Sequence, residues 1–352
     1  MYVSLKDVAA RAGVSFQTVS KVLNGGAATV SDKTQARIRA AAAELGYVPN
    51  ALARGLITQS TYTVGIVADD LDDWVLAQFV VGAEREARDQ GHVVLIGAVL
   101  PGGEDARAYA QQLLERRVDG ILAAAPNHED DEGVADLLRS RVPAVSMHHV
   151  PGGGVPVVGS DHSRAGRFAA EHLVELGHRI IGTVIGPRGR RVVQSRLRGF
   201  RSALGRADRV LSPARIVQSD WTVAGGYAAA CELLDREPRV TAIFAQNDLM
   251  AVGVISALHA RGRRVPDDCA VVGCDDLPVS AHLIPPLTTV SIPFRETGRR
   301  AMALLIDRIR GADVAQRVLL PMRLVVRESS AGEAGGVPRS SGRPYALGKD
   351  HR

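Results

Sequence analysis

The chain has 352 residues, enough for two or three domains, and hydrophobic residues make up 46% of it. No apolar run reaches the length of a membrane span, and the N-terminus lacks a charged-then-apolar signal pattern. We therefore expect a cytoplasmic protein without a membrane partner. The three cysteines, at positions 231, 269 and 274, show no CxxC spacing. We expect them to be small apolar side chains rather than a disulfide framework or zinc site, and we expect no metal and no cofactor.

The net charge of +5 is unevenly placed along the chain. Residues 1–60 carry a net +4 and the segment from Ala331 carries +2, which leaves the middle close to neutral. A basic N-terminal segment beside a nearly neutral middle segment favours a polyanionic partner that binds to the N-terminal segment.

The first twenty-four residues predict two short helices joined by a tight turn. Gly13 supplies the turn, and Ser15 can cap the second helix. The apolar positions of the two helices fall on one side of each: Leu5, Val8, Ala9 and Ala12, then Val19, Val22 and Leu23. The other side of the second helix is short, polar and basic, with groups suited to bases and phosphates: Phe16, Gln17, Ser20, Lys21 and Asn24. This pattern is a helix-turn-helix, whose second helix would lie in the major groove of DNA.

A third helix is expected to follow the helix-turn-helix. Ser31 is its predicted cap, and the helix runs through Ile38 to Gly46. Three helices can close a small all-α headpiece, which Pro49 then ends.

From Tyr62 onward, β-branched runs alternate with amphipathic helical stretches. The expected strands include 64–67, 93–96, 120–123, 144–147, 180–185, 241–245 and 270–273, and the expected helices include 74–90, 164–176, 194–204 and 249–261. This alternation predicts doubly wound parallel sheets, and its two rounds predict an α/β core of two similar lobes. Ligands of such sheets bind at the carboxyl ends of the strands, here in the cleft between lobes.

Polar and aromatic residues stand near these strand ends. The candidate effector-binding residues are Asp69, Trp74, His148, Arg198, Trp221, Asn247 and Asp275. Carboxylates, an amide and a guanidinium can bind the vicinal hydroxyls of a sugar, and an indole can stack on its apolar face. Each polar residue could instead cap a helix or form a salt bridge, and Asp248 is interpreted as a helix cap. The adjacent His148 and His149 would point opposite ways on an extended segment, which argues against a metal site.

Several motifs in order resemble the LacI/GalR family of bacterial transcriptional regulators. Besides the N-terminal pattern they include Leu45–Arg54, Glu171–Arg179, Arg196–Phe200, Gln246–Gly253, Val271–Asp276 and Pro286–Val290, and together they span residues 3 to about 328. The resemblance implies a headpiece over 1–48, a hinge helix over 49–60 and a two-lobed, periplasmic-binding-protein-like core over 61–330. It also implies a homodimer that binds near-palindromic double-stranded operator DNA and a small carbohydrate effector, and it places Arg198, Trp221, Asn247 and Asp275 at the sugar.

The resemblance also implies which residues contact DNA. They are Leu5, Ser15, Phe16, Gln17, Ser20, Lys21, Asn24, Thr34, Asn50, Ala53 and Leu56, with Leu56 as a wedge in the minor groove. Gly55 departs from the pattern inside the hinge and should cost about 1 kcal/mol of helix stability relative to Ala. We therefore expect Gly55→Ala to tighten operator binding.

Other departures from the family bear on specificity. Phe16 and Lys21 stand where relatives often carry Tyr and Arg, which indicates a different operator. Ile292 and Ala124 stand where relatives carry polar side chains, and Asp69 and His148 also differ from relatives. We therefore expect this chain to bind a different sugar from the one those relatives bind.

Two other functions would share part of this pattern. A sugar-transport binding protein would share the body but would lack the helix-turn-helix. An enzyme acting on a sugar or nucleotide is the alternative, but Gly186–Arg191 matches a phosphate loop only loosely, without the following Lys-Ser/Thr. The Gly-, Pro- and Ser-rich segment 331–352 is expected to be disordered, and its lack of a leucine heptad predicts a dimer rather than a tetramer.

Overall fold

The structure is a computed structural model that describes residues 3–23, 29–48, 60–99 and 106–331. Internal contacts divide the chain into two units, each assembled from separate segments. The first comprises Met1–Asp72, Val80–Pro156 and Arg299–Val314, and the second comprises Asp73–Phe79, Val157–Gly298 and Ala315–Arg352. No helix among the described residues is long and apolar enough to cross a membrane.

The headpiece consists of three short helices around a small core. They are α1 (Leu5–Ala12), α2 (Phe16–Leu23) and α3 (Asp32–Glu44). Gly13 ends α1 with a φ of 61°, a conformation that glycine adopts without strain. The buried side chains are the apolar ones that the helical spacing predicts: Val8, Ala9, Ala12, Val19, Val22, Ile38, Ala41 and Ala42. The helix-turn-helix prediction is confirmed.

Two serines begin helices of the headpiece in different ways. Ser15 Oγ accepts a hydrogen bond from the Thr18 N–H over 3.2 Å, so it caps α2 as predicted. Ser31 stands at the N-cap of α3, but its Oγ lies 3.0 Å from the Thr34 hydroxyl and makes no capping bond. The prediction that the Ser31 side chain caps α3 is therefore wrong, because the Ser31 hydroxyl pairs with the Thr34 hydroxyl instead of a backbone N–H.

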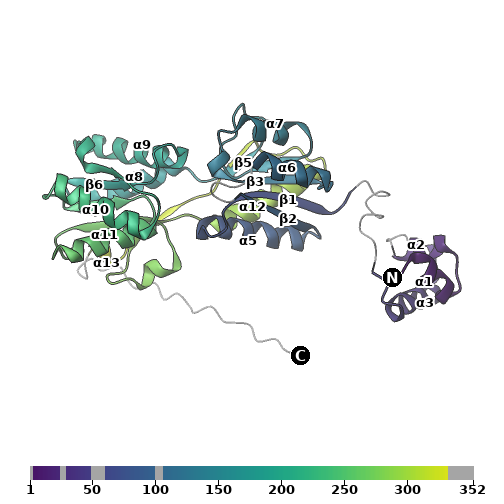
Figure 1. Ribbon diagram of the computed structural model, residues 1–352. Helices are drawn as coiled ribbons and strands as arrows, with labels where there is room; N and C mark the ends of the chain where they lie inside the picture. Colours follow the sequence, from purple (N-terminus) through teal and green to yellow (C-terminus); the bar gives the residue numbers. More distant parts are fainter. Residues whose placement is uncertain (1–2, 24–28, 49–59, 100–105, 332–352) are drawn as a thin grey trace. The chain divides into compact units, whose positions relative to one another are not determined.

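One six-stranded sheet has the strand order β11-β5-β4-β3-β1-β2, of which Figure 1 labels β5, β3, β1 and β2. Its strands are β1 (Thr63–Asp69), β2 (Val93–Val99), β3 (Gly120–Ala124), β4 (Ala144–Ser146), β5 (Val157–Gly159) and β11 (Arg317–Leu319). The accompanying helices are α5 (Trp74–Asp89), α6 (Ala106–Glu115), η2 (Pro126–His128), α7 (Glu132–Ser140) and α12 (Phe294–Ile309). The boundary between the two units falls inside α5 and inside α12.

The other six-stranded sheet has the order β12-β10-β9-β8-β6-β7. Its strands are β6 (Ile181–Ile185), β7 (Ile216–Gln218), β8 (Ala242–Ala245), β9 (Ala270–Asp275), β10 (Thr288–Ser291) and β12 (Arg323–Val325). The accompanying helices are α8 (His162–Glu175), α9 (Arg191–Arg206), η3 (Pro213–Arg215), α10 (Val223–Arg236), α11 (Asp248–Ala260), η4 (Pro278–His282) and α13 (Glu328–Ala331).

Helices cover both faces of this second sheet, with α8 and α9 on one side and α10 and α11 on the other (Figure 1). Along β8, Phe244 packs toward α8 and α9, while Ile243 packs toward α10 and α11. This arrangement confirms the doubly wound prediction. The expectation of parallel strands is corrected at one edge, where β12 pairs antiparallel with β10 through Val290 and Leu324.

Candidate functional site

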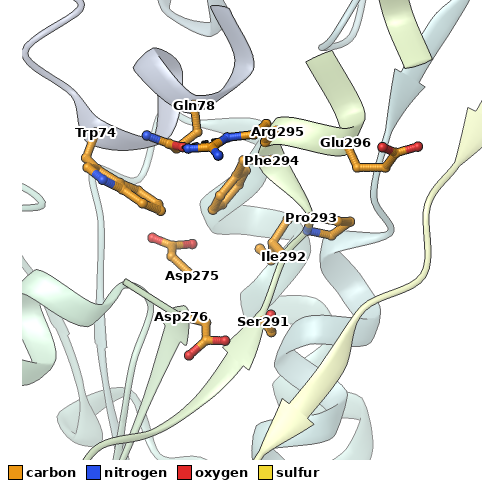
Figure 2. Close-up of a pocket in the computed structure, with 10 residues that line it drawn as sticks. All are labelled: Trp74, Gln78, Asp275, Asp276, Ser291, Ile292, Pro293, Phe294, Arg295 and Glu296. Atoms are coloured by element: carbon orange, nitrogen blue, oxygen red, sulfur yellow. Dashed lines mark hydrogen bonds between the residues drawn. The ribbon is translucent and has the colours of Figure 1, made fainter. Parts of the chain in front are cut away.

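A pocket of about 400 Å³ lies on the second unit, at the carboxyl end of β9 (Figure 2). Its lining comes from the start of α5, the end of β9, and the passage from β10 into α12: Trp74, Gln78, Asp275, Asp276, Ser291, Ile292, Pro293, Phe294, Arg295 and Glu296. A pocket at this place is what the strand-end rule for parallel sheets predicts.

Asp275, which lines the pocket, belongs to a buried ion pair. Arg196, on α9, donates from Nη2 to Oδ1 of Asp275 over 3.1 Å, and the side chains are only 5% and 7% exposed. Arg196 also donates from Nη1 to the Gln246 carbonyl. Burial raises the pKa of Asp275 to about 7, although the charge of Arg196 works in the opposite direction. The carboxylate can therefore change its charge near neutral pH.

The close crossing of α8 and α9 fixes where Arg196 stands. A Cβ on Gly166 would lie 1.9 Å from the Arg196 carbonyl oxygen, and a Cβ on Gly199 would lie 1.8 Å from that of Ser163. His162 lies on α8 one turn before Gly166. Burial first, and then the charge of Arg196, lowers the pKa of His162 to about 3, so its ring is neutral.

Three buried polar atoms in this region lack a hydrogen-bond partner among the described residues. They are Arg196 Nε, Gln246 Oε1 and His162 Nδ1. Buried polar atoms are normally paired, so these atoms have donor and acceptor capacity left for a ligand hydroxyl or a water molecule.

The backbone is strained where Asp275 enters the pocket. Asp275 has a φ of 121° and Asp276 a φ of 58°, so two successive residues with side chains occupy a region that favours glycine. Asp276 is held by Arg327, whose Nη2 donates to its Oδ1 over 2.8 Å. Such strain persists only where surrounding contacts over-determine the conformation.

The apolar part of the pocket is aromatic. The Trp74 and Phe294 rings meet edge to face, with centroids 6.5 Å apart, and Phe79 meets Phe294 in the same way at 5.2 Å. Trp74 is 36% exposed, so part of its indole is open to a ligand, and it faces Asp275 across the pocket (Figure 2). An aromatic ring opposite a carboxylate can stack on a sugar ring and bind its hydroxyls.

Of the predicted effector residues, Trp74 and Asp275 line this pocket. Asp69 and His148 belong to the first unit, at the ends of β1 and β4. Asp69 accepts hydrogen bonds from the Asn127 N–H and from the His128 ring. His148 Nδ1 lies 2.8 Å from the His149 carbonyl oxygen.

The arginine that reaches Asp275 is Arg196, not the Arg198 favoured by the sequence. Arg198 lies on the exposed side of α9 and donates to Ser195 Oγ over 2.8 Å. The helical period could have found Arg196, because it shares the buried side of α9 with Val193 and Phe200.

Trp221 and Asn247 contact each other outside the pocket lining. Asn247 Nδ2 donates to the Trp221 carbonyl over 3.0 Å, and its Oδ1 caps α11 by accepting from the Met250 N–H. The interpretation of Asp248 as the cap is therefore wrong. Asp248 is the first residue of α11, and its carboxylate accepts a hydrogen bond from the Leu277 N–H instead of a backbone N–H of α11.

The predicted DNA-contacting residues lie on the headpiece as expected where the structure describes them. Ser15, Phe16, Gln17 and Lys21 are exposed, with Phe16 at 47%, and Ser20 and Thr34 are half-buried. Leu5 is half-buried against the headpiece core. The remaining predicted contacts lie outside the described residues, as does most of the expected hinge: Asn24, Asn50, Ala53 and Leu56.

Among the described residues, the cysteines and the other metal-binding side chains form no metal site. Cys269 and Cys274 are buried and Cys231 is partly buried, and all three are free. Across the part of the chain that the structure describes, no three His, Cys, Asp or Glu side chains gather as a metal site would require.

Comparison with known proteins matches two sequence families. Residues 4–50 match the bacterial regulatory proteins of the lacI family, and residues 170–330 match the periplasmic binding protein-like domain. The HTH-type transcriptional regulator CelR of Thermobifida fusca is 38% identical over 335 residues, which cover 93% of this chain and 98% of that protein.

Solved structures give the same result. A lac repressor dimer bound to operator and the anti-inducer ONPF superposes with a TM-score of 0.86 at 33% identity, covering 94% of this chain and 99% of that one. A CelR–cellobiose complex superposes with a TM-score of 0.70 at 36% identity, covering 93% and 100%.

Proposed function

The chain belongs to the LacI family of bacterial regulatory proteins, and from this membership we propose that it represses transcription by binding operator DNA under the control of a carbohydrate. The observation that carries the proposal is the pocket itself. It combines a buried carboxylate paired with an arginine and a partly open indole on the opposite side. These are the groups that a polyhydroxylated ring requires.

The effector site is proposed to centre on Asp275, Arg196 and Trp74. Asp275 accepts hydrogen bonds from vicinal hydroxyls, Arg196 orients that carboxylate, and Trp74 stacks on the sugar ring. CelR is a relative whose structure holds cellobiose, so cellobiose is the first sugar to try. The expected roles of Asp69, His148, Arg198, Trp221 and Asn247 remain predictions.

The DNA-binding end is proposed to be α2. Its exposed side chains Phe16, Gln17 and Lys21 would meet base edges in the major groove, and Ser15, Ser20 and Thr34 would meet phosphates. A lac repressor dimer is the relative seen on operator. We propose that this chain likewise acts as a dimer, with two headpieces on a near-palindromic site in the cytoplasm.

Sugar and operator are proposed to be coupled as two ligands of one conformational equilibrium. Sugar binding favours a state that fits the operator less well, and such coupling is typically about 1–3 kcal/mol. Linkage then requires that operator binding weakens sugar binding by the same factor.

A sugar panel that includes cellobiose, read by Trp fluorescence and followed by gel shift, tests this function. The chain has only two tryptophans, Trp74 and Trp221, and Trp74 lines the pocket. We expect one sugar to change both the fluorescence and the operator affinity. A sugar that binds without any effect on operator affinity would refute the coupling.

The relatives are regulators rather than enzymes. We propose that this chain has no catalytic activity of its own. Turnover assays with nucleotides and glycosides should therefore show no product above the buffer rate, and a rate that Asp275→Asn abolishes would contradict this.

A further inference from the structure

Asp248 carries a second buried carboxylate, which does not line the pocket but is bonded to the chain next to Asp276. Asp248 is fully buried at the first position of α11. Its Oδ2 accepts from the Leu277 N–H over 2.8 Å and from Ser280 Oγ over 2.6 Å, while its Oδ1 accepts from Thr289 Oγ1 over 2.5 Å. One carboxylate thus joins the residue after Asp276, the η4 turn and strand β10.

Thr289 extends this set of bonds to the strained turn itself. While its hydroxyl donates to Asp248, the same oxygen accepts the Asp276 N–H over 3.3 Å. Thr289 is fully buried, so no water competes for these bonds. The Asp276 side chain is held separately, by Arg327.

The sheet leaves room for the Asp248 carboxylate at one place. A Cβ on Gly273 would lie 2.3 Å from Asp248 Oδ1, so only a glycine at this point of β9 lets the carboxylate approach the strand. Two residues further along the same strand is Asp275. The carboxylate therefore contacts the chain on both sides of the residue that enters the pocket.

We propose that Asp248 and Thr289 are positioning residues of the effector site, because they hold the Asp275–Asp276 turn in the strained conformation that presents Asp275 to Arg196 and to a bound carbohydrate. This inference rests on the proposed function for the role of Asp275. A positive φ at two successive aspartates is unfavourable unless other contacts enforce it. The bonds to Leu277 N–H and Asp276 N–H are backbone bonds of that turn.

The test compares two isosteric substitutions in one sheet. Thr289→Val removes the hydroxyl that reaches Asp248 and Asp276, and Thr183→Val removes an equally buried hydroxyl that donates to the Phe244 carbonyl. Asp248→Asn is the second variant of the positioning set, in case Thr289→Val fails to fold. All are made in the full-length chain, and thermal unfolding is recorded for each.

Cellobiose affinity by isothermal titration calorimetry is the first readout. We expect Thr289→Val and Asp248→Asn to weaken cellobiose binding by about tenfold or more, because the Asp275 carboxylate that accepts the sugar hydroxyls is displaced. Thr183→Val should change cellobiose affinity by less than about twofold. The decrease in the midpoint temperature of unfolding should be similar for the two valine variants. If both positioning variants bind cellobiose as tightly as Thr183→Val does, the proposal is overturned.

A second readout needs no sugar and separates the two proposals. Trp74 and Asp275 line the same pocket, so Trp fluorescence should follow the ionisation of Asp275 with a midpoint near its pKa of about 7, and Asp275→Asn should abolish that transition. We expect Thr289→Val to move the midpoint by at least about half a pH unit and Thr183→Val to leave it in place. If Asp275→Asn binds cellobiose as tightly as the wild-type chain in the calorimetric titration, the sugar site lies elsewhere and the proposed function fails. An unmoved fluorescence midpoint in Thr289→Val would by itself overturn the positioning role.

Discussion

Arg196 and Asp275 form a salt bridge of 3.1 Å in which both side chains are more than nine-tenths buried. One partner comes from the buried side of α9 and the other from the end of β9, and the pocket opens beside the carboxylate. Breaking a buried pair leaves an uncompensated charge, which is far more damaging than loss of an exposed pair. The pair therefore ties the stability of the second unit to the chemistry of the pocket.

We predict that Arg196→Gln and Arg198→Gln differ sharply. Arg196→Gln should lower the free energy of unfolding by about 3–5 kcal/mol, because it leaves the Asp275 carboxylate buried without a cation, and should abolish sugar binding. Arg198→Gln removes an exposed arginine whose hydrogen bond, within the described part of the chain, goes to Ser195, so we expect the free energy of unfolding to change by less than about 0.5 kcal/mol. Urea unfolding and sugar titration measure both effects. Equal sugar affinity of the two variants would contradict the assignment of Arg196 to the site.

This pair also shows how far the sequence could predict the site. Strand–helix alternation and strand-end placement led to Asp275 and to the doubly wound core. The helical period places Arg196, and not Arg198, on the buried side of α9 with Val193 and Phe200. Its meeting with Asp275 depends on the close crossing at Gly166 and Gly199 and on a strand end 79 residues later, which periodicity within one helix does not report.

Capping was equally hard to predict from residue types alone. Asn247 and Asp248 are both good N-cap residues, and the sequence favoured Asp248. In the structure Asn247 caps α11, because the Asp248 carboxylate is taken by Ser280, Thr289 and the Leu277 N–H. These partners lie about thirty to forty residues later, so no local rule places them.

Sugar binding should depend on pH through Asp275. The pKa of this carboxyl is about 7, and the ionised form accepts stronger hydrogen bonds from hydroxyls than the protonated form does. We therefore predict that sugar affinity rises as the pH increases from about 6 to about 8, with a midpoint near 7. Calorimetric titration at several pH values measures this, and a flat profile in the wild-type chain would refute it.

The same pKa shift has a consequence for folding. The folded-state pKa of Asp275 lies above the ordinary aspartate value of 3.8, so the folded form holds its proton more tightly than the unfolded chain does. The contribution of this group to stability is complete below 3.8 and is lost as the pH rises through about 7. Asp275→Asn should remove this part of the pH dependence, together with that of sugar binding.

The α8–α9 crossing predicts opposite effects for two glycines on one helix. Gly199→Ala would force a Cβ to 1.8 Å from the Ser163 carbonyl oxygen, so we expect at least about 1–3 kcal/mol of destabilisation and weaker sugar binding as Arg196 shifts. Gly205→Ala, on the same helix with no atom within 4 Å of the new Cβ, should stabilise by about 0.5–1 kcal/mol. Chemical denaturation of the two variants decides the matter, and a neutral Gly199→Ala would show that the helices can separate without cost.

Two exposed side chains on α2 should affect operator binding differently. Gln17→Ala removes a side chain that can bind a base edge bidentately, so we expect it to lose about 1–3 kcal/mol at the preferred operator and to bind altered bases almost as well. Lys33→Ala, on the exposed start of α3, serves as the control for loss of a headpiece charge away from α2. It should weaken binding to all sequences alike, or not at all. Gel shifts over a set of operators with single base changes measure both variants, and a Gln17→Ala that weakens every operator by the same factor would place Gln17 on the phosphates instead of the bases.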